Sequence, residues 1–146
     1  MPITVDITKN ELVPFVEQFL NSLSRGEKAL VLGLSGDLGA GKTTFAQTLA
    51  QLLGVVEIVQ SPTFVVMKRY DTKHHTFKTL IHIDAYRLHS GQELLSLGFE
   101  NLKNDPETLI VIEWPEQVGD CIIPTERLMF EHTNDENMRK INRITH

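Results

Sequence analysis

Hydrophobic residues fall at helical spacing in some stretches of the chain and in short unbroken runs in others, and this difference predicts the secondary structure. Over residues 10–24 they recur three and four positions apart, which predicts an amphipathic helix. Thr8 and Glu11 have the spacing of a capping box, whereas Pro14 would remove a helical N–H beyond the first turn of a helix capped there. We therefore expect this helix to begin later, near Glu11.

Short apolar runs predict strands, and polar links between neighbouring runs predict hairpins. Residues 71–75 and 133–137 are two such polar links. The expected order after the first helix is strand 29–34, helix 44–53 ending at Gly54, strand 64–70, strand 76–84, a short helix at 91–97, strand 109–112, and strands 127–132 and 138–144. This mixture predicts a single α/β domain over residues 1–146, with a mixed, largely parallel central sheet flanked by helices.

Residues 36–43 read Gly-Asp-Leu-Gly-Ala-Gly-Lys-Thr, which is the complete pattern of a phosphate-binding loop. The loop follows a predicted strand and opens a predicted helix, as this pattern requires. Backbone N–H groups of such a loop cradle phosphate oxygens, Lys42 adds a positive charge, and the Thr43 hydroxyl can bind Mg²⁺. The pattern predicts a P-loop NTPase-like fold and a phosphate site formed by Asp37, Leu38, Gly39, Ala40, Gly41, Lys42, Thr43 and Thr44.

Two carboxylates stand at the ends of apolar strands, Asp84 after residues 80–83 and Glu113 after residues 109–112. If both strands run parallel to the one before the loop, both side chains face it. Nucleotide hydrolysis needs one group to hold the metal and another to orient water, and these residues alone leave open which acid does which. Trp114, beside Glu113, would either pack in the core or at its rim, or shape the mouth of the site and report on the nucleotide.

Two further positions near these motifs have open roles. Thr63 lies in the link Ser61-Pro62-Thr63-Phe64, where its hydroxyl either reaches the γ-phosphate or Mg²⁺ or belongs to an ordinary turn. His82 lies two residues before Asp84, and we expect it to be a packed histidine and not a catalytic one.

Composition and charge argue against two classes of protein, those whose whole surface binds nucleic acid and those that span a membrane. A net charge of −5 over 146 residues argues against a surface that grips nucleic acid as a whole. No apolar stretch approaches the roughly 20 residues that span a bilayer, so no membrane contact is expected. A single cysteine and an N-terminus without a signal-peptide pattern fit the cytoplasm.

Four blocks in this order and spacing resemble the TsaE family (formerly YjeE), bacterial ATPases needed to make threonylcarbamoyladenosine in tRNA. The blocks are Gly36 to Thr44, Ser61-Pro62-Thr63-Phe64, His82-Ile83-Asp84-Ala85-Tyr86-Arg87-Leu88 and Glu113-Trp114-Pro115-Glu116. The resemblance implies ATP as the nucleotide, Mg²⁺, and slow hydrolysis that depends on a TsaB–TsaD heterodimer. TsaD would transfer the threonylcarbamoyl group, this chain would reset the complex between turnovers, and tRNA would be held mainly by the partners.

The same resemblance implies roles for single residues. Lys42 and Thr43 would serve phosphate and Mg²⁺, Glu113 would help hold Mg²⁺, and Asp84 would orient or activate the attacking water. Thr63 would belong to a switch-like loop, and Trp114 would line the site. The sequence departs from the family at residues 12–15, where the family often has a threonine and a glycine near the base. Adenine contacts are therefore expected near Thr8 and Glu11.

Three other functions are compatible with the same loop. A small-molecule kinase would need an acceptor pocket and usually an arginine-rich lid, but no arginine lies between Arg87 and Arg127. A GTP-dependent switch commonly uses an N-K-x-D element, which the chain lacks. A catalytically idle scaffold would not need Lys42, Asp84 and Glu113 together.

Overall fold

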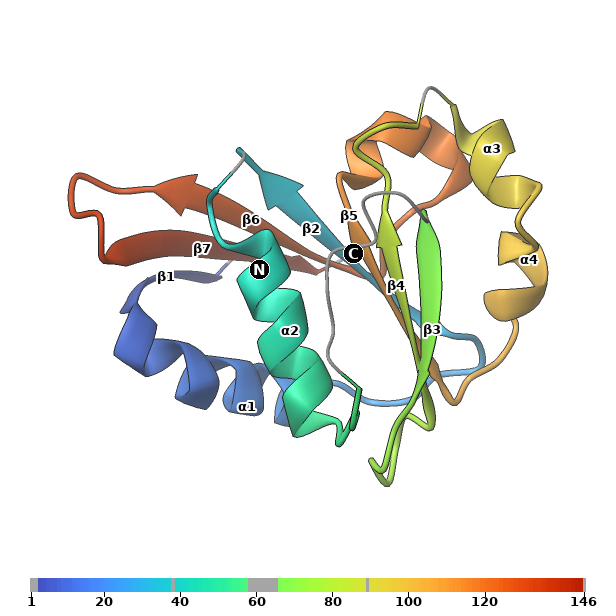
Figure 1. Cartoon of the computed structure of the whole chain (residues 1–146), viewed down its shortest axis with the longest axis horizontal. Helices are drawn as coiled ribbons and strands as arrows, with labels where there is room; N and C mark the ends of the chain where they lie inside the picture. Colours follow the sequence, from blue (N-terminus) through green and yellow to red (C-terminus); the bar gives the residue numbers. More distant parts are fainter. Residues whose placement is uncertain (1–2, 38, 58–65, 89, 146) are drawn as a thin grey trace.

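The computed structural model describes residues 3–37, 39–57, 66–88 and 90–145, and the strands among them form one sheet in the order β1-β7-β6-β2-β5-β4-β3 (Figure 1). The strands are β1 (Ile3–Thr8), β2 (Leu30–Gly36), β3 (Met67–Asp71), β4 (Thr79–Asp84), β5 (Thr108–Glu113), β6 (Glu126–His132) and β7 (Met138–Thr145). The four adjacent strands β6, β2, β5 and β4 are parallel, whereas β1, β7 and β3 join antiparallel. The expected mixed α/β sheet and both hairpins are therefore confirmed.

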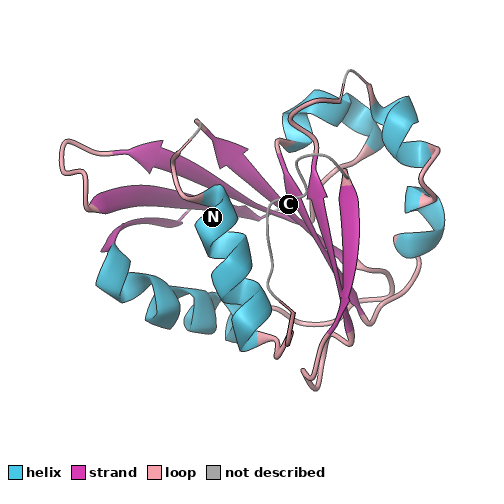
Figure 2. Ribbon diagram, in the orientation of Figure 1, coloured by secondary structure: helices cyan, strands magenta, loops and turns pink. Residues whose placement is uncertain are grey.

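Helices cover both faces of this sheet (Figure 2). They are η1 (Lys9–Glu11), α1 (Leu12–Ser22), α2 (Lys42–Leu52), α3 (Gly91–Leu95), α4 (Phe99–Leu102) and η2 (Pro115–Cys121). Helices α1 and α2 pack on one face, and α3, α4 and η2 pack on the other. No helix in the described part of the chain is long and apolar enough to cross a bilayer.

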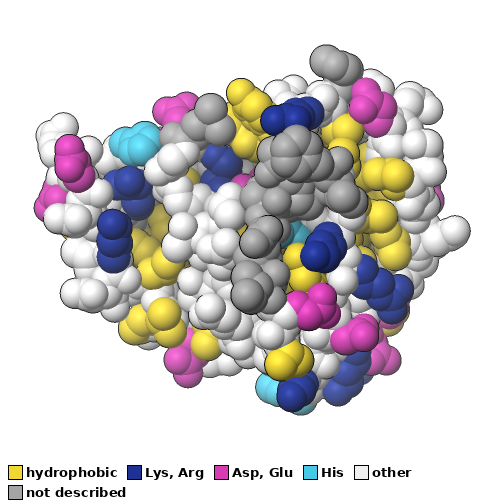
Figure 3. Space-filling model, viewed as in Figure 1, with side chains coloured by type: hydrophobic (Ala, Val, Ile, Leu, Met, Phe, Trp, Pro, Cys, Tyr) yellow, Lys and Arg dark blue, Asp and Glu magenta, His cyan; other side chains and the backbone are white. Residues whose placement is uncertain are grey.

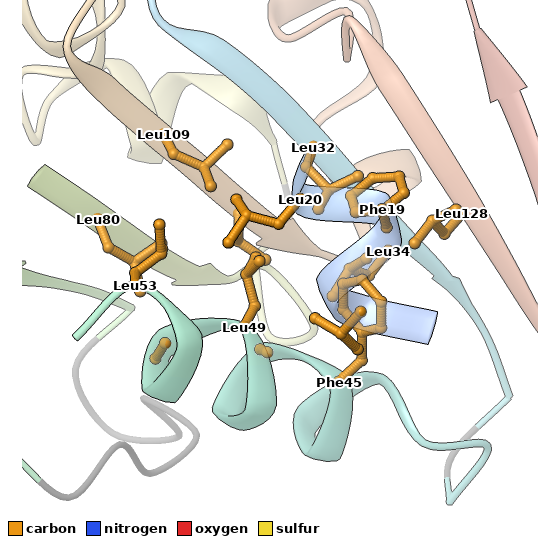
Figure 4. Packing of buried hydrophobic residues seen from close by; sticks show 14 of the residues in the cluster. Phe19, Leu20, Leu32, Leu34, Phe45, Leu49, Leu53, Leu80, Leu109 and Leu128 are labelled. Carbon is orange, nitrogen blue, oxygen red and sulfur yellow. The ribbon is translucent and has the colours of Figure 1, made fainter. Parts of the chain in front are cut away.

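Alternate residues of the central strands point to opposite faces, as the pleat of a sheet requires. Leu32, Leu34, Leu80, Leu109 and Leu128 meet α1 and α2 in one buried cluster (Figure 4). The residues between them, such as Ile81 and Ile110, meet α3, α4 and η2 in a second cluster. Strands β4 and β5 end in Asp84 and Glu113, which share parity with the leucines, so both acids belong to the face covered by α2.

The first helix begins where the sequence placed it. The Glu11 carboxylate accepts hydrogen bonds from the Thr8 backbone N–H at 3.0 Å and the Thr8 hydroxyl at 2.9 Å. These bonds close the turn of η1, and α1 begins one residue later, at Leu12. Pro14 therefore falls in the first turn of α1, where a backbone N–H has no helical partner to lose.

Candidate functional site

The phosphate loop joins the end of β2 to the start of α2, with two glycines at its ends in conformations that other residues rarely adopt. Gly36 has φ +135°, and a Cβ on it would lie 2.3 Å from the backbone oxygen of Phe130 in β6. Gly41 has φ +107° and is the N-cap of α2. The first N–H groups of α2 have no helical acceptor and can bind an anion. Leu38 lies outside the described residues.

The Lys42 side chain is 4% exposed and turns back onto its own loop. Its ammonium group donates to the backbone oxygen of Gly36 and, at 2.8 Å, to that of Asp37. It also lies 4.2 Å from the centre of the Trp114 ring. Burial lowers the pKa of Lys42, and the carboxylates around it, Glu113 first among them, partly oppose this effect. The charge is thus held by groups that a phosphate could replace.

Glu113 joins three elements through its carboxylate. The Thr43 hydroxyl of α2 donates to Oε1 at 2.9 Å, and Nε2 of His82 on β4 lies 2.6 Å from Oε2. Glu113 is 3% exposed and His82 is 1% exposed. His82 is a packed histidine, as expected, and its pairing with Glu113 was not predicted.

Asp84 lies beside Glu113 at the carboxyl ends of β4 and β5, where the two residues are register partners. Oδ1 of Asp84 accepts the Tyr86 backbone N–H at 3.0 Å, which shapes the turn after β4. A central cavity of about 380 Å³ is lined by Lys42, Thr43, Asp84, Arg87, Glu113 and Trp114. The parallel strands therefore bring both acids to the phosphate loop, as the sequence pattern predicted.

Trp114 has φ 62° and ψ 51°, the one positive φ of a non-glycine residue in the described ranges. Its backbone N–H donates to the Leu34 oxygen at 3.0 Å, which fixes the turn after β5. The Tyr86 ring lies 5.1 Å away, centre to centre. Such left-handed backbone costs of order 1–3 kcal/mol. The conformation keeps the indole beside Lys42 at the wall of the central cavity.

A second, side cavity of about 140 Å³ adjoins the loop and shares Gly39, Gly41 and Thr44 with the central one. Its walls are mostly apolar and include Ile7, Leu12, Phe130 and Ile141, with Thr8, Lys9 and Arg139 among the polar residues. Of the two residues expected near adenine, Thr8 lines this cavity, whereas Glu11 does not and is bound to Thr8. A base contact by Glu11 stays a prediction.

The donor set around the loop suits Mg²⁺. Thr43 and Glu113 offer hard oxygen ligands that already lie 2.9 Å apart, and Mg²⁺ is commonly held by one or two such groups plus phosphate oxygens. Within the described ranges, no group of three or more His, Cys, Asp or Glu residues could hold a metal by itself. Thr63 lies outside the described residues, so its expected place near the γ-phosphate stays a prediction.

Sequence reasoning missed the contribution of β7 to the side cavity. Arg139 donates to the Gly39 oxygen at 3.5 Å across 100 positions of sequence, and Asn137 also lines the cavity. Neither residue belongs to a motif. Asn137 lies just before β7 and Arg139 lies in β7, and the pairing of β7 with β6 brings them to the loop.

Comparison with known proteins identifies the family of the chain. Residues 8–142 match the family model described as "Threonylcarbamoyl adenosine biosynthesis protein TsaE". The chain is 35% identical to the tRNA threonylcarbamoyladenosine biosynthesis protein TsaE of Borreliella burgdorferi, covering 83% of this chain and 82% of that one. It is 34% identical to the protein of the same name from Haemophilus influenzae, covering 81% of this chain and 72% of the relative.

The fold also has a solved counterpart. The crystal structure of Bacillus subtilis YdiB superposes with a TM-score of 0.74 at 24% identity, covering 99% of this chain and 86% of that chain. At this identity the likeness concerns the fold alone. The family match and the relatives carry the assignment, and the chain belongs to the TsaE family of tRNA threonylcarbamoyladenosine biosynthesis proteins.

Proposed function

We propose that this chain is the Mg²⁺-dependent ATPase of tRNA threonylcarbamoyladenosine synthesis, slow alone and stimulated by a TsaB–TsaD heterodimer that it resets between turnovers. One observation carries the ATPase part of the proposal. Thr43, at the start of the phosphate-loop helix, is hydrogen bonded to Glu113 at the end of a parallel strand, with Lys42 and Asp84 on the same cavity. This is the set of groups that phosphoryl transfer from a nucleotide requires.

Each residue has a distinct task in this proposal. Lys42 leaves the oxygens of Gly36 and Asp37 and pairs with the terminal phosphates. Thr43 and Glu113 hold Mg²⁺, which neutralises phosphate charge when bound. Asp84, which lines the central cavity beside Glu113, orients the attacking water. Free N–H groups at the start of α2 add to the anion site.

The side cavity is the proposed site of the nucleobase and ribose. It opens from the loop at Gly39 and Gly41, so a nucleotide with its phosphates on the loop can extend into it. Apolar walls from Ile7, Leu12 and Phe130 suit a planar base. Arg139, next to the Gly39 oxygen, is placed to contact the sugar or α-phosphate side of such a ligand.

The surface charge supports the proposal that the partners, and not this chain, bind tRNA. The net charge is −5, and acidic and basic side chains are interspersed on the face seen in Figure 3. A surface that binds tRNA by itself would be expected to gather basic residues. We infer that tRNA meets this chain only through the TsaB–TsaD complex, which implies a cytoplasmic setting.

The chemistry is tested by following ATP labelled on the γ-phosphate with the purified chain, Mg²⁺ and TsaB–TsaD. The proposal expects the label to appear as inorganic phosphate, with little product from Lys42→Ala. Label that appears instead on a metabolite added as acceptor would favour a small-molecule kinase. Label that stays in ATP would favour an idle nucleotide-binding scaffold.

A further inference from the structure

His82 is a buried polar residue that has no role in the phosphate-loop motif or in the proposed hydrolysis of ATP. Its ring lies on β4, 1% exposed, with Nε2 2.6 Å from Oε2 of Glu113. Nδ1 is buried and has no hydrogen-bond partner among the described residues. The ring is therefore tied to the rest of the site through one atom, and that atom faces Glu113.

The contact fixes which ring nitrogen carries a proton. A carboxylate oxygen only accepts, so the short contact requires that Nε2 carries the hydrogen. The opposite tautomer would turn a lone pair toward the carboxylate and would leave an N–H buried without an acceptor at Nδ1. A buried acceptor nitrogen without a hydrogen-bond partner costs less free energy than a buried N–H without an acceptor. The surroundings of Nδ1 in His82 therefore also favour the form with the proton on Nε2.

The two oxygens of Glu113 are consequently divided between two neighbours. His82 holds Oε2, and Oε1 faces the Thr43 hydroxyl at 2.9 Å. The terminal torsion of a glutamate is broad and poorly fixed by its own rotamer preferences. Without the imidazole, both oxygens could rotate about this torsion, and the carboxylate would lose its preferred orientation toward α2.

We propose that His82 is a positioning residue that holds Oε2 of Glu113, so that Oε1 is presented, with the Thr43 hydroxyl, to the metal of the nucleotide complex. The inference rests on the proposed function. A carboxylate binds a metal better through one oxygen when a neighbouring side chain holds its other oxygen in place. Loss of such a neighbour typically costs about 10–100-fold in metal affinity. His82 itself touches neither nucleotide nor metal.

The test uses Mn²⁺ as a spectroscopic stand-in for Mg²⁺ and a non-hydrolysable ATP analogue. His82→Phe keeps the ring volume but removes the donor, whereas His82→Gln keeps an N–H near the position of Nε2. By electron paramagnetic resonance, we expect His82→Phe to weaken Mn²⁺ binding to the analogue-bound chain about 10–100-fold. Metal-free analogue affinity should stay unchanged, and His82→Gln should recover most of the loss. His75→Phe, an exposed histidine, is the matched control.

Three outcomes would overturn the inference. One is a folded His82→Phe variant with wild-type Mn²⁺ affinity. Another is an equal loss in His82→Phe and His82→Gln, which would mark a packing role. A third is independent of any variant's folding, because ¹⁵N NMR of the wild-type imidazoles reports the tautomer, and a proton on Nδ1 alone would rule the contact out. If the wild type binds neither analogue nor metal, the proposed function itself fails, and this inference with it.

Discussion

The ammonium group of Lys42 lies 4.2 Å from the centre of the Trp114 ring, at the wall of the central cavity. A cation over an indole face is attracted by the ring's quadrupole, and the attraction grows as water is excluded. Lys42 also donates to the oxygens of Gly36 and Asp37. The loop and the indole therefore hold the lysine in place together.

Nucleotide binding should change the fluorescence of Trp114. Phosphates compete for the Lys42 ammonium group and draw it away from the ring, so the emission of the indole is expected to change. Trp114 is the only tryptophan in the chain, so the signal has one source. Titration with ATP, with and without Mg²⁺, measures the response.

Lys42→Ala should weaken ATP binding, measured by isothermal titration calorimetry because the variant lacks the ammonium group beside Trp114, by about 10–150-fold, the value of one lost hydrogen bond to a charged group. Lys28→Ala is a suitable control, because this exposed lysine precedes β2 at the opposite end of the strand from the loop. An unaltered ATP affinity in Lys42→Ala would count against the assigned phosphate site.

Glu113→Gln should lose most Mg²⁺-dependent hydrolysis while it retains nucleotide. The amide keeps the volume of the side chain but removes the negative charge and replaces one of the two carboxylate oxygens with an NH₂ group, which cannot ligate a metal. Hydrolysis should fall by at least roughly 10–100-fold, which is the usual effect of removing a residue that only hydrogen bonds to a metal ligand. Glu107→Gln, exposed and just before the other end of β5, is the control. Mg²⁺ dependence that survives intact in Glu113→Gln would show that another group holds the metal.

The sequence predicted those parts of the fold that depend on local chemistry. The Gly-rich loop could only join a strand to a helix, and apolar runs identified β2 and β5. Pro14 placed the start of the first helix near Glu11 and not at the Thr8 cap, and the acids at the ends of two apolar strands pointed to the edge where the cavity lies. In each case, neighbouring residues carry the signal.

The sequence did not predict features that arise from distant pairing. Strand β1 was missed, since its ladder partner is β7 and the bond from Thr4 to Asn142 joins residues 138 positions apart. The same pairing brings Arg139 to the loop. The short helix expected at 91–97 is α3, which already ends at Leu95, and α4, which begins after Gly98 with φ 85°, was not predicted. The partner of His82 likewise depends on the register of β4 against β5.

Phe45→Ala should destabilise the fold strongly. The Phe45 ring is fully buried and makes edge contacts with the rings of Phe19 and Phe130, 5.7 Å and 5.6 Å away, centre to centre. Deleting such a ring leaves a cavity between α1, α2 and the sheet, at a cost of about 3–5 kcal/mol in the free energy of unfolding. Urea denaturation followed by circular dichroism measures this. Val56→Ala, 82% exposed, should stay within about 0.5 kcal/mol of the wild type.

Glu11 should stabilise the protein in a pH-dependent way. Hydrogen bonds from the Thr8 backbone and hydroxyl lower the pKa of Glu11 below its ordinary value of 4.5. An acid with a lowered folded-state pKa stabilises the fold above its unfolded pKa, and this contribution disappears as pH falls through the folded pKa. The difference in unfolding free energy between wild type and Glu11→Ala should therefore be largest above pH 4.5 and should shrink below it. A difference that stays constant down to strong acid would assign the effect to packing.

The most direct test of the proposed function is ATP turnover by this chain alone and with purified TsaB–TsaD, with Lys42→Ala beside it. We predict slow hydrolysis by the chain alone, clear stimulation by the heterodimer, and loss of both in the variant. A folded, ATP-binding wild type that TsaB–TsaD leaves unstimulated would contradict the proposed role as the ATPase of the complex.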